Sequence, residues 1–530
     1  MQEHEVSKAK GKDNAQTQRT QRFAELRRRR MKSLAVTILT IVVGLVGVAT
    51  AAHGQKSGPP PASAQAAAGK QKAVATTATT KYEATIESLK THPLPEWYAD
   101  AKLGIFIHWG LYSVPGWAVL TPEGTKLSEE EYIKRNPYAE WYLNTLRIKG
   151  SPTEAYHKEH YGADYDYYNF AETFNKEVQK WKPEEWARVF KMAGARYVVL
   201  TSKHHEGFTL WPSETPNPTL PRERQHASRD LVGELTTAVR AEGMKMGLYY
   251  SGGYDWTFIP GPITNWKMAK SVEPQTPEYG KYADAHMREL IRKYQPSVLW
   301  NDIDYPKSGH PLEIMAEYYN AVPDGVIDDR FGVEHSDFTS PEYETLTDIE
   351  EKKWEECRGL GRSFGYNRAE GEKDTIAKDT LIYLLVDIVS KNGNLLLDVG
   401  PEADGTIPAV QMDRLEALGA WLKVNGEAIY GTRPWTRAEG EASERLRVRF
   451  TRKGSAVYAV ILGEPTQKTV TIKNIKVKED GGVTWVTGAD ERTSSTWRQD
   501  GDDLVITVPQ PLPSKYAVTV KLAGVESARE

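Results

Sequence analysis

Short apolar runs alternate with segments of helical periodicity between residues 81 and 435, and this order constrains the fold more than any other feature of the chain. The runs expected to form strands are residues 103–108, 197–202, 246–250, 297–302, 325–330 and 394–400. Residues 183–193, 230–242 and 381–389 are expected helices. Continuously apolar strands that alternate with helices indicate a parallel sheet covered on both faces.

Polar side chains end most of these runs. They are His108, the pair His204 and His205, the pair Tyr249 and Tyr250, Asp302 and Arg330. In a (β/α)8 barrel, such side chains converge at the C-terminal ends of the strands. A doubly wound open sheet also binds ligands at that edge and is the alternative. Six strands over residues 81–435 favour an α/β fold with a (β/α)8-like TIM-barrel domain.

The sequence pattern changes after Trp435. Short alternating strands are expected at residues 446–450, 457–462, 469–475, 483–486, 504–508 and 517–522, with Gly, Asp and Lys-rich turns between them. This spacing predicts a C-terminal antiparallel β-sandwich over residues 436–525, followed by a tail, 526–530.

The N-terminal region, residues 1–52, has the composition of a secretory signal. Arg27 to Arg30 precede an apolar run, residues 34–48, and Ala49-Thr50-Ala51 follows as a small-residue cleavage site. The run is shorter than the about 20 residues of a membrane span, but an uncleaved anchor is the alternative. Residues 53–80, rich in Gly, Pro, Ala and Ser, are expected to form a disordered linker.

The single cysteine, Cys357, excludes an internal disulfide, so we expect an exported bacterial protein, periplasmic or secreted. Ten of the 68 basic and four of the 72 acidic residues lie in residues 1–52, so the rest of the chain carries a net charge of −10. An acidic body argues against nucleic acid as a partner. No stable membrane partner is expected unless the signal is retained, and a homo-oligomer is left open.

Asp302 ends an apolar run, where an ionised carboxylate is costly unless it faces a polar cavity. Trp300 lies two residues earlier and therefore on the same side of the strand. Glu140 and Trp141 lie in the long segment after the first strand, and Glu342 follows Arg330 by 12 residues. Each acid alone also has an ordinary explanation, as a turn cap, a helix residue or an exposed loop residue.

The histidines permit two interpretations. His108, His204, His205 and Glu206 could bind zinc, but they lack the i, i+4 spacing of a helical zinc site. Neutral imidazoles are also good hydrogen-bond partners for sugar hydroxyls. We therefore favour a sugar site without metal, and a metal-dependent barrel hydrolase remains an alternative.

Several stretches together resemble glycoside hydrolase family 29, the α-L-fucosidases. They are residues 97–110, 203–208, 248–253, 299–302, 363–367 and 394–401, with Arg433-Pro434-Trp435 at the end of the barrel region. The resemblance implies a (β/α)8-like barrel with a C-terminal β-sandwich. It also implies retaining hydrolysis of terminal α-L-fucose from oligosaccharides or glycoconjugates by double displacement, without a cofactor.

The resemblance also assigns residues. It implies Asp302 as nucleophile and Glu342 as acid/base, with Glu140 in reserve because this acid moves in sequence between branches of the family. The implied fucose pocket comprises His108, Glu140, Trp141, His204, His205, Tyr249, Trp300, Arg330 and Phe364. Glu206 departs from the more usual Asp. The same motifs are compatible with an α-L-galactosidase-type exo-glycosidase and with a non-catalytic sugar-binding protein.

Overall fold

The computed structural model describes residues 81–122, 124–488 and 493–526. The expected signal segment and linker, and residues 527–530 of the tail, lie outside the described residues. Tyr82 and the residues after it belong to one compact unit. Among the described residues, no helix has the length and apolar character needed to cross a membrane.

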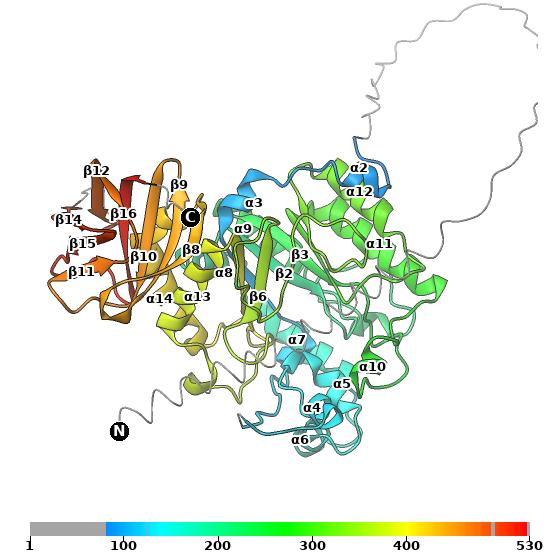
Figure 1. Cartoon of the computed structure of the whole chain (residues 1–530). Coiled ribbons are helices and arrows are strands. Elements are labelled where there is room, and N and C mark those ends of the chain that lie inside the picture. Colours follow the sequence, from blue (N-terminus) through cyan, green and yellow to red (C-terminus); the bar gives the residue numbers. More distant parts are fainter. Residues whose placement is uncertain (1–80, 123, 489–492, 527–530) are drawn as a thin grey trace, which may run out of the picture. The chain divides into compact units, whose positions relative to one another are not determined.

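The central sheet consists of parallel strands in the order β5-β4-β3-β2-β1-β7-β6. Figure 1 labels β2, β3 and β6 of this sheet. Its strands are β1 Leu103–Ile107, β2 Tyr197–Lys203, β3 Lys245–Ser251, β4 Val298–Asp302, β5 Val326–Ile327, β6 Trp354–Gly359 and β7 Gly393–Val399. All six expected strands are confirmed, although β5 has only two residues. The sequence prediction missed β6, because Glu355, Glu356 and Arg358 interrupt its apolar pattern.

An irregular segment, residues 337–343, links the two edge strands of this sheet. The Asp337 N–H donates to the Ile327 carbonyl of β5 at 2.9 Å. On the other side, the Tyr343 N–H donates to the Cys357 carbonyl of β6 at 3.1 Å, and Glu342 forms a parallel bridge with Cys357. This segment therefore takes the place of an eighth strand, and the predicted (β/α)8-like architecture is confirmed with this irregularity.

Helices lie between the strands as expected. They are α2 Ile86–Leu89, α3 Glu96–Ala101, α4 Glu129–Lys134, α5 Tyr142–Leu146, α6 Pro152–His160, α7 Phe170–Glu177, α8 Pro183–Met192, α9 Leu231–Ala241, α10 Trp266–Ala269, α11 Pro277–Tyr294, α12 Pro311–Ala321, α13 Lys378–Ser390 and α14 Ala409–Asn425. The helix α8 begins with proline and buries Trp186, Ala187 and Phe190 on one face. At α9, the Asp230 side chain caps the first turn through the Gly233 N–H.

The C-terminal part forms two antiparallel sheets, drawn in orange and red in Figure 1. One has the order β13-β12-β16-β10-β9-β8 and the other β11-β15-β14. The strands are β8 Arg433–Glu441, β9 Arg447–Lys453, β10 Ala456–Leu462, β11 Thr469–Ile472, β12 Val477–Trp485, β13 Thr493–Ser494, β14 Trp497–Asp500, β15 Asp503–Thr507 and β16 Ala517–Val525. The predicted β-sandwich is confirmed, and the predicted junction at Trp435 lies within β8.

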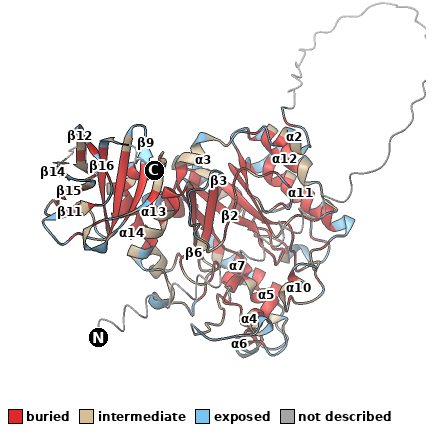
Figure 2. Cartoon of the chain, in the orientation of Figure 1, coloured by how far each residue is buried: buried red, intermediate tan, exposed pale blue. Residues whose placement is uncertain are grey.

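Burial follows the two cores. Figure 2 shows the labelled strands β2 and β3 of the parallel sheet in the buried colour. The strands of the C-terminal sheets mix buried positions with intermediate and exposed ones, as β12 does. Every residue of β1, β2 and β7 is buried. The helix α14 fastens the sandwich to the barrel, because the Trp421 indole N–H donates to the Ala517 carbonyl at 2.9 Å and the Thr519 hydroxyl donates to Asn425 at 2.8 Å.

Candidate active site

Asp302 is the last residue of β4, and its carboxylate is held by two donors. The Tyr249 hydroxyl donates to Oδ2 at 2.8 Å, and Nη1 of Arg330 donates to Oδ1 at 2.8 Å. Nε2 of His205 lies 4.0 Å from Oδ2. A guanidinium and a hydroxyl donor both favour the ionised form of a carboxylate. These donors hold the Asp302 carboxylate at the mouth of the barrel, where the residue is only 7% exposed.

The backbone turns sharply after Asp302. Ile303 and Asp304 both adopt left-handed conformations, with φ of 61° and 62°. Gly253, after β3, donates its N–H to the Asp302 carbonyl at 3.1 Å. A Cβ atom on Gly253 would lie 1.6 Å from the Ile303 carbonyl oxygen, so only glycine permits this approach.

Glu342 shares Arg330 with Asp302. Nη1 and Nη2 of Arg330 each lie 3.4 Å from Oε2 of Glu342, and the Tyr138 hydroxyl lies 3.4 Å from Oε1. Since Oδ1 of Asp302 and Oε2 of Glu342 lie 2.8 Å and 3.4 Å from the same Nη1 atom, they are at most 6.2 Å apart. The two acids are thus close enough for the about 5–5.5 Å separation of retaining glycosidases.

Arg330 is itself fixed in place. Its Nε donates to the Ser340 hydroxyl and its Nη2 to the Ser340 carbonyl, both at 3.0 Å. The guanidinium lies 4.4 Å from the centre of the Trp300 ring, within cation–π range. Arg330, predicted to bind the sugar, therefore holds the two acids in place relative to each other.

Trp300 packs against both Arg330 and Tyr249. It is 1% exposed, and its indole N–H donates to Glu355 at 3.1 Å. Its ring stacks on Tyr249 with centroids 5.5 Å apart. Tyr250 points the other way and contacts His286 at 3.2 Å, so strand alternation directs Tyr249 to the site, as predicted.

Three histidines form one wall of the candidate active site. The ring centres of His204 and His205 lie 3.9 Å apart, and those of His108 and His204 lie 5.5 Å apart. Nδ1 of His108 lies 2.6 Å from Asp398. Burial, with smaller contributions from neighbouring basic side chains, lowers the pKa of both His108 and His205 well below the ordinary value. These two imidazoles are neutral and suited to hydrogen bonds with hydroxyls.

Glu140, Trp141 and Phe364 complete the wall. Oε2 of Glu140 accepts from the Gly365 N–H at 2.8 Å and from the Ser363 hydroxyl at 3.1 Å. Burial raises the pKa of Glu140, while the neighbouring His204 and these donors oppose the rise. The Trp141 ring lies 5.7 Å from His205, and Phe364 lies 4.9 Å from His108. The structure thus brings all the predicted site residues together.

Several contributors were not predicted. Asp398 contacts His108, Ser251 contacts His205 at 2.7 Å, and Tyr138 contacts Glu342. Asp398 and Ser251 lie near the ends of β7 and β3, so the rule that found His108 and Asp302 could have found them. Nothing in the sequence marks Tyr138. Within the described residues, no group of three or more His, Cys, Asp or Glu side chains is placed to hold a metal ion.

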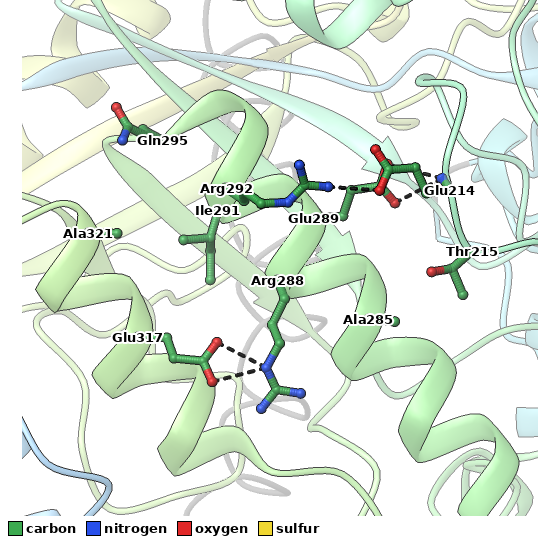
Figure 3. A pocket seen from close by; sticks show the side chains of 10 residues that line it. All are labelled: Glu214, Thr215, Ala285, Arg288, Glu289, Ile291, Arg292, Gln295, Glu317 and Ala321. Atoms are coloured by element: carbon green, nitrogen blue, oxygen red, sulfur yellow. Dashed lines mark hydrogen bonds and ion pairs between the residues drawn. The ribbon is translucent and has the colours of Figure 1, made fainter. Parts of the chain in front are cut away.

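A separate hollow of about 520 Å³ lies on the outside of the barrel, between α11, α12 and the loop at Glu214 (Figure 3). Arg288 pairs there with Glu317, and Arg292 pairs with Glu214. None of the predicted site residues lines it. Its charged groups neutralise one another, so it offers no chemistry to compare with that of Asp302 and Glu342.

Comparisons with known proteins agree with this geometry. Residues 70–427 match the family model described as alpha-L-fucosidase. The tissue alpha-L-fucosidase of Bos taurus is 34% identical over 471 residues, covering 84% of this chain and 92% of the bovine protein. The alpha-L-fucosidase of Dictyostelium discoideum is 36% identical, and the match covers 67% of this chain and 75% of the Dictyostelium protein. The solved structure of the Thermotoga maritima alpha-fucosidase in complex with a mechanism-based inhibitor is 43% identical in sequence and has a TM-score of 0.76. The match covers 83% of this chain and 100% of the Thermotoga chain.

Proposed function

The chain belongs to the α-L-fucosidase family, and on that premise we propose that Asp302 is its nucleophile and Glu342 its general acid and base. The protein is a glycoside hydrolase that releases terminal α-L-fucose. The observation that carries the assignment is the single guanidinium that contacts both carboxylates. Glu140 is the weaker candidate for the acid, because Ser363 and Gly365 engage its carboxylate whereas Glu342 shares Arg330 with Asp302.

In the first step, Asp302 attacks the anomeric carbon while the protonated carboxyl of Glu342 gives its proton to the departing oxygen. The C–O bond to the aglycone breaks as the bond to Asp302 forms. In the second step, Glu342 takes a proton from water, and the water oxygen displaces Asp302. Two inversions at one carbon give net retention of configuration.

The shared Arg330 suits both roles of Glu342. In the free enzyme its guanidinium contacts both carboxylates. Once Asp302 is bonded to the sugar, that carboxylate has become an ester and Arg330 attracts Glu342 alone. Arg330 therefore still positions Glu342 at the step that needs a base.

The walls of the pocket suit a 6-deoxy sugar. His108, His204, His205 and Glu140 offer polar atoms to hydroxyls, and Phe364 offers an apolar surface to the C5 methyl group. The substrate is a fucosylated oligosaccharide or glycoconjugate. An α-L-galactosidase-type activity would place a hydroxyl against that apolar surface.

We expect the first sugar released from 4-nitrophenyl α-L-fucoside to be the α anomer. Proton NMR during the first minutes of hydrolysis, before mutarotation, measures this directly. A first-formed β anomer would exclude the double displacement. Activity that EDTA abolishes, and that added divalent metal restores, would favour the metal-dependent alternative.

We also propose that the protein is exported. The support is the basic, apolar and small-residue order of residues 27–51, which lie outside the described residues. The mature protein recovered from the periplasm or medium is expected to begin after Ala51. Full-length protein retained in the membrane fraction would instead favour the uncleaved anchor.

A further inference from the structure

The ring of His205 is held in one orientation. It is packed by the rings of His204, Tyr254, Trp256 and Trp141, with centroid distances of 3.9, 5.3, 5.4 and 5.7 Å. The residue is only 2% exposed. A ring enclosed in this way cannot exchange the positions of its two nitrogens without moving its neighbours.

The two nitrogens of His205 face different groups. Nδ1 points to the hydroxyl of Ser251, the last residue of β3, at 2.7 Å. Nε2 points to the sugar side of the site, where Oδ2 of Asp302 lies 4.0 Å away. The ring therefore lies between a buried hydroxyl and the proposed nucleophile.

The hydrogen count at Ser251 decides which nitrogen carries the proton. A serine hydroxyl has one hydrogen, and that of Ser251 is donated to the Tyr254 carbonyl at 2.8 Å. The same oxygen must then accept from Nδ1 of His205. In the reverse arrangement the bond to Tyr254 is lost, and an Nε2–H would face Asp302 across 4.0 Å, which is too long for a hydrogen bond. The first arrangement makes two hydrogen bonds and the second makes one.

A doubly protonated ring is disfavoured. Burial lowers the pKa of His205 well below the ordinary value, and the electrostatic interactions with His204 and Lys203 lower it further. The Asp302 carboxylate faces the ring, but Arg330 and Tyr249 already engage it. Nδ1 therefore carries the single proton, and Nε2 presents a lone pair to the pocket.

We propose that Ser251 is a positioning residue that fixes the Nδ1–H form of His205, so that Nε2 accepts a hydrogen bond from a hydroxyl of the bound sugar. The inference rests on the proposed function, because it places the sugar against Asp302. It adds a rule for specificity: one position of the sugar must carry a hydrogen-bond donor. Fluorine, which does not donate, cannot replace that hydroxyl.

The proton position can be read directly by NMR. In the wild-type enzyme with ¹⁵N-labelled histidine, the His205→Gln variant identifies the signals of His205. We expect a protonated Nδ1 and an unprotonated Nε2 in the free enzyme at neutral pH. A protonated Nε2, in either the other tautomer or the imidazolium, would overturn the proposal. This measurement does not require the Ser251 variants to fold.

Inhibition constants test the consequence for binding. L-fucose is compared with its monodeoxy and monodeoxyfluoro analogues at C2, C3 and C4. At one of these positions we expect hydrogen and fluorine to weaken binding alike, by about tenfold. In Ser251→Ala the other tautomer of His205 becomes accessible. The preference for hydroxyl over fluorine should therefore shrink in this variant, and only at that position of the sugar. Ser251→Thr keeps the hydroxyl and should keep the preference.

Ser202→Ala is a matched control. Its buried hydroxyl donates to the Tyr249 carbonyl at 2.6 Å and lies on the neighbouring strand β2. This variant should keep the preference for hydroxyl over fluorine. If Ser251→Ala keeps it as well, the proposal is wrong. Failure of the nucleophile assignment would appear separately, as activity remaining in an Asp302 variant, whereas the NMR result does not depend on that role.

Discussion

Asp302→Gly will hydrolyse 4-nitrophenyl α-L-fucoside roughly 10⁴-fold more slowly than the wild type. The change removes the oxygen that would bond to the anomeric carbon, and Arg330 and Glu342 cannot replace it. Azide fits the vacated space beside Arg330 and can attack in its place. Added azide should therefore restore turnover and give β-L-fucosyl azide, the product of a single inversion.

Asp304→Gly is the matched control for this experiment. Asp304 lies two residues away, and its left-handed φ of 62° is one that glycine adopts without strain. This variant should keep most of the activity and should not respond to azide. Substantial hydrolysis by Asp302→Gly, or the same azide response in both variants, would assign the nucleophile to another residue.

The sequence predicted the first of the two acids better than the second because of how each is positioned. Asp302 ends a regular parallel strand, and the C-terminal ends of such strands meet at one rim. His108, Tyr249 and Arg330 were found by the same reasoning. Glu342 lies instead on the irregular segment 337–343, where no periodicity marks a strand. Its position depends on its bridge to Cys357 and on Arg330, which are contacts between distant segments.

The strand β6 was missed for a related reason. Glu355 is completely buried there, a position that sequence reasoning reserves for apolar residues. The hydroxyls of Tyr98 and Tyr197 and the indole N–H of Trp300 all donate to its carboxylate. These donors come from three separate elements, so their convergence on Glu355 is invisible in the sequence. The prediction that Trp300 packs against the sugar stays a prediction, since Arg330 covers one face of its ring.

Glu342→Ala will lose activity according to the leaving group. On a fucosyl disaccharide, whose leaving alcohol needs a proton, we expect a loss of about 10³-fold in kcat/KM. On an activated aryl fucoside, kcat/KM should fall far less, because the leaving oxygen departs without a proton. The second step still lacks its base, so the fucosyl-enzyme should accumulate. Azide needs no base and should raise kcat, giving α-L-fucosyl azide with retained configuration.

Glu140→Ala distinguishes the two candidate acids under identical conditions. Glu140 is held by Ser363 and Gly365, so its removal should weaken binding of all fucosides by a similar factor. If Glu140→Ala instead shows the dependence on leaving group and Glu342→Ala the uniform loss, the acid is Glu140. In that case Glu342 would be no more than a second carboxylate that Arg330 holds beside Asp302. The slope of activity against leaving-group pKa in the two variants therefore decides which carboxylate carries the proton.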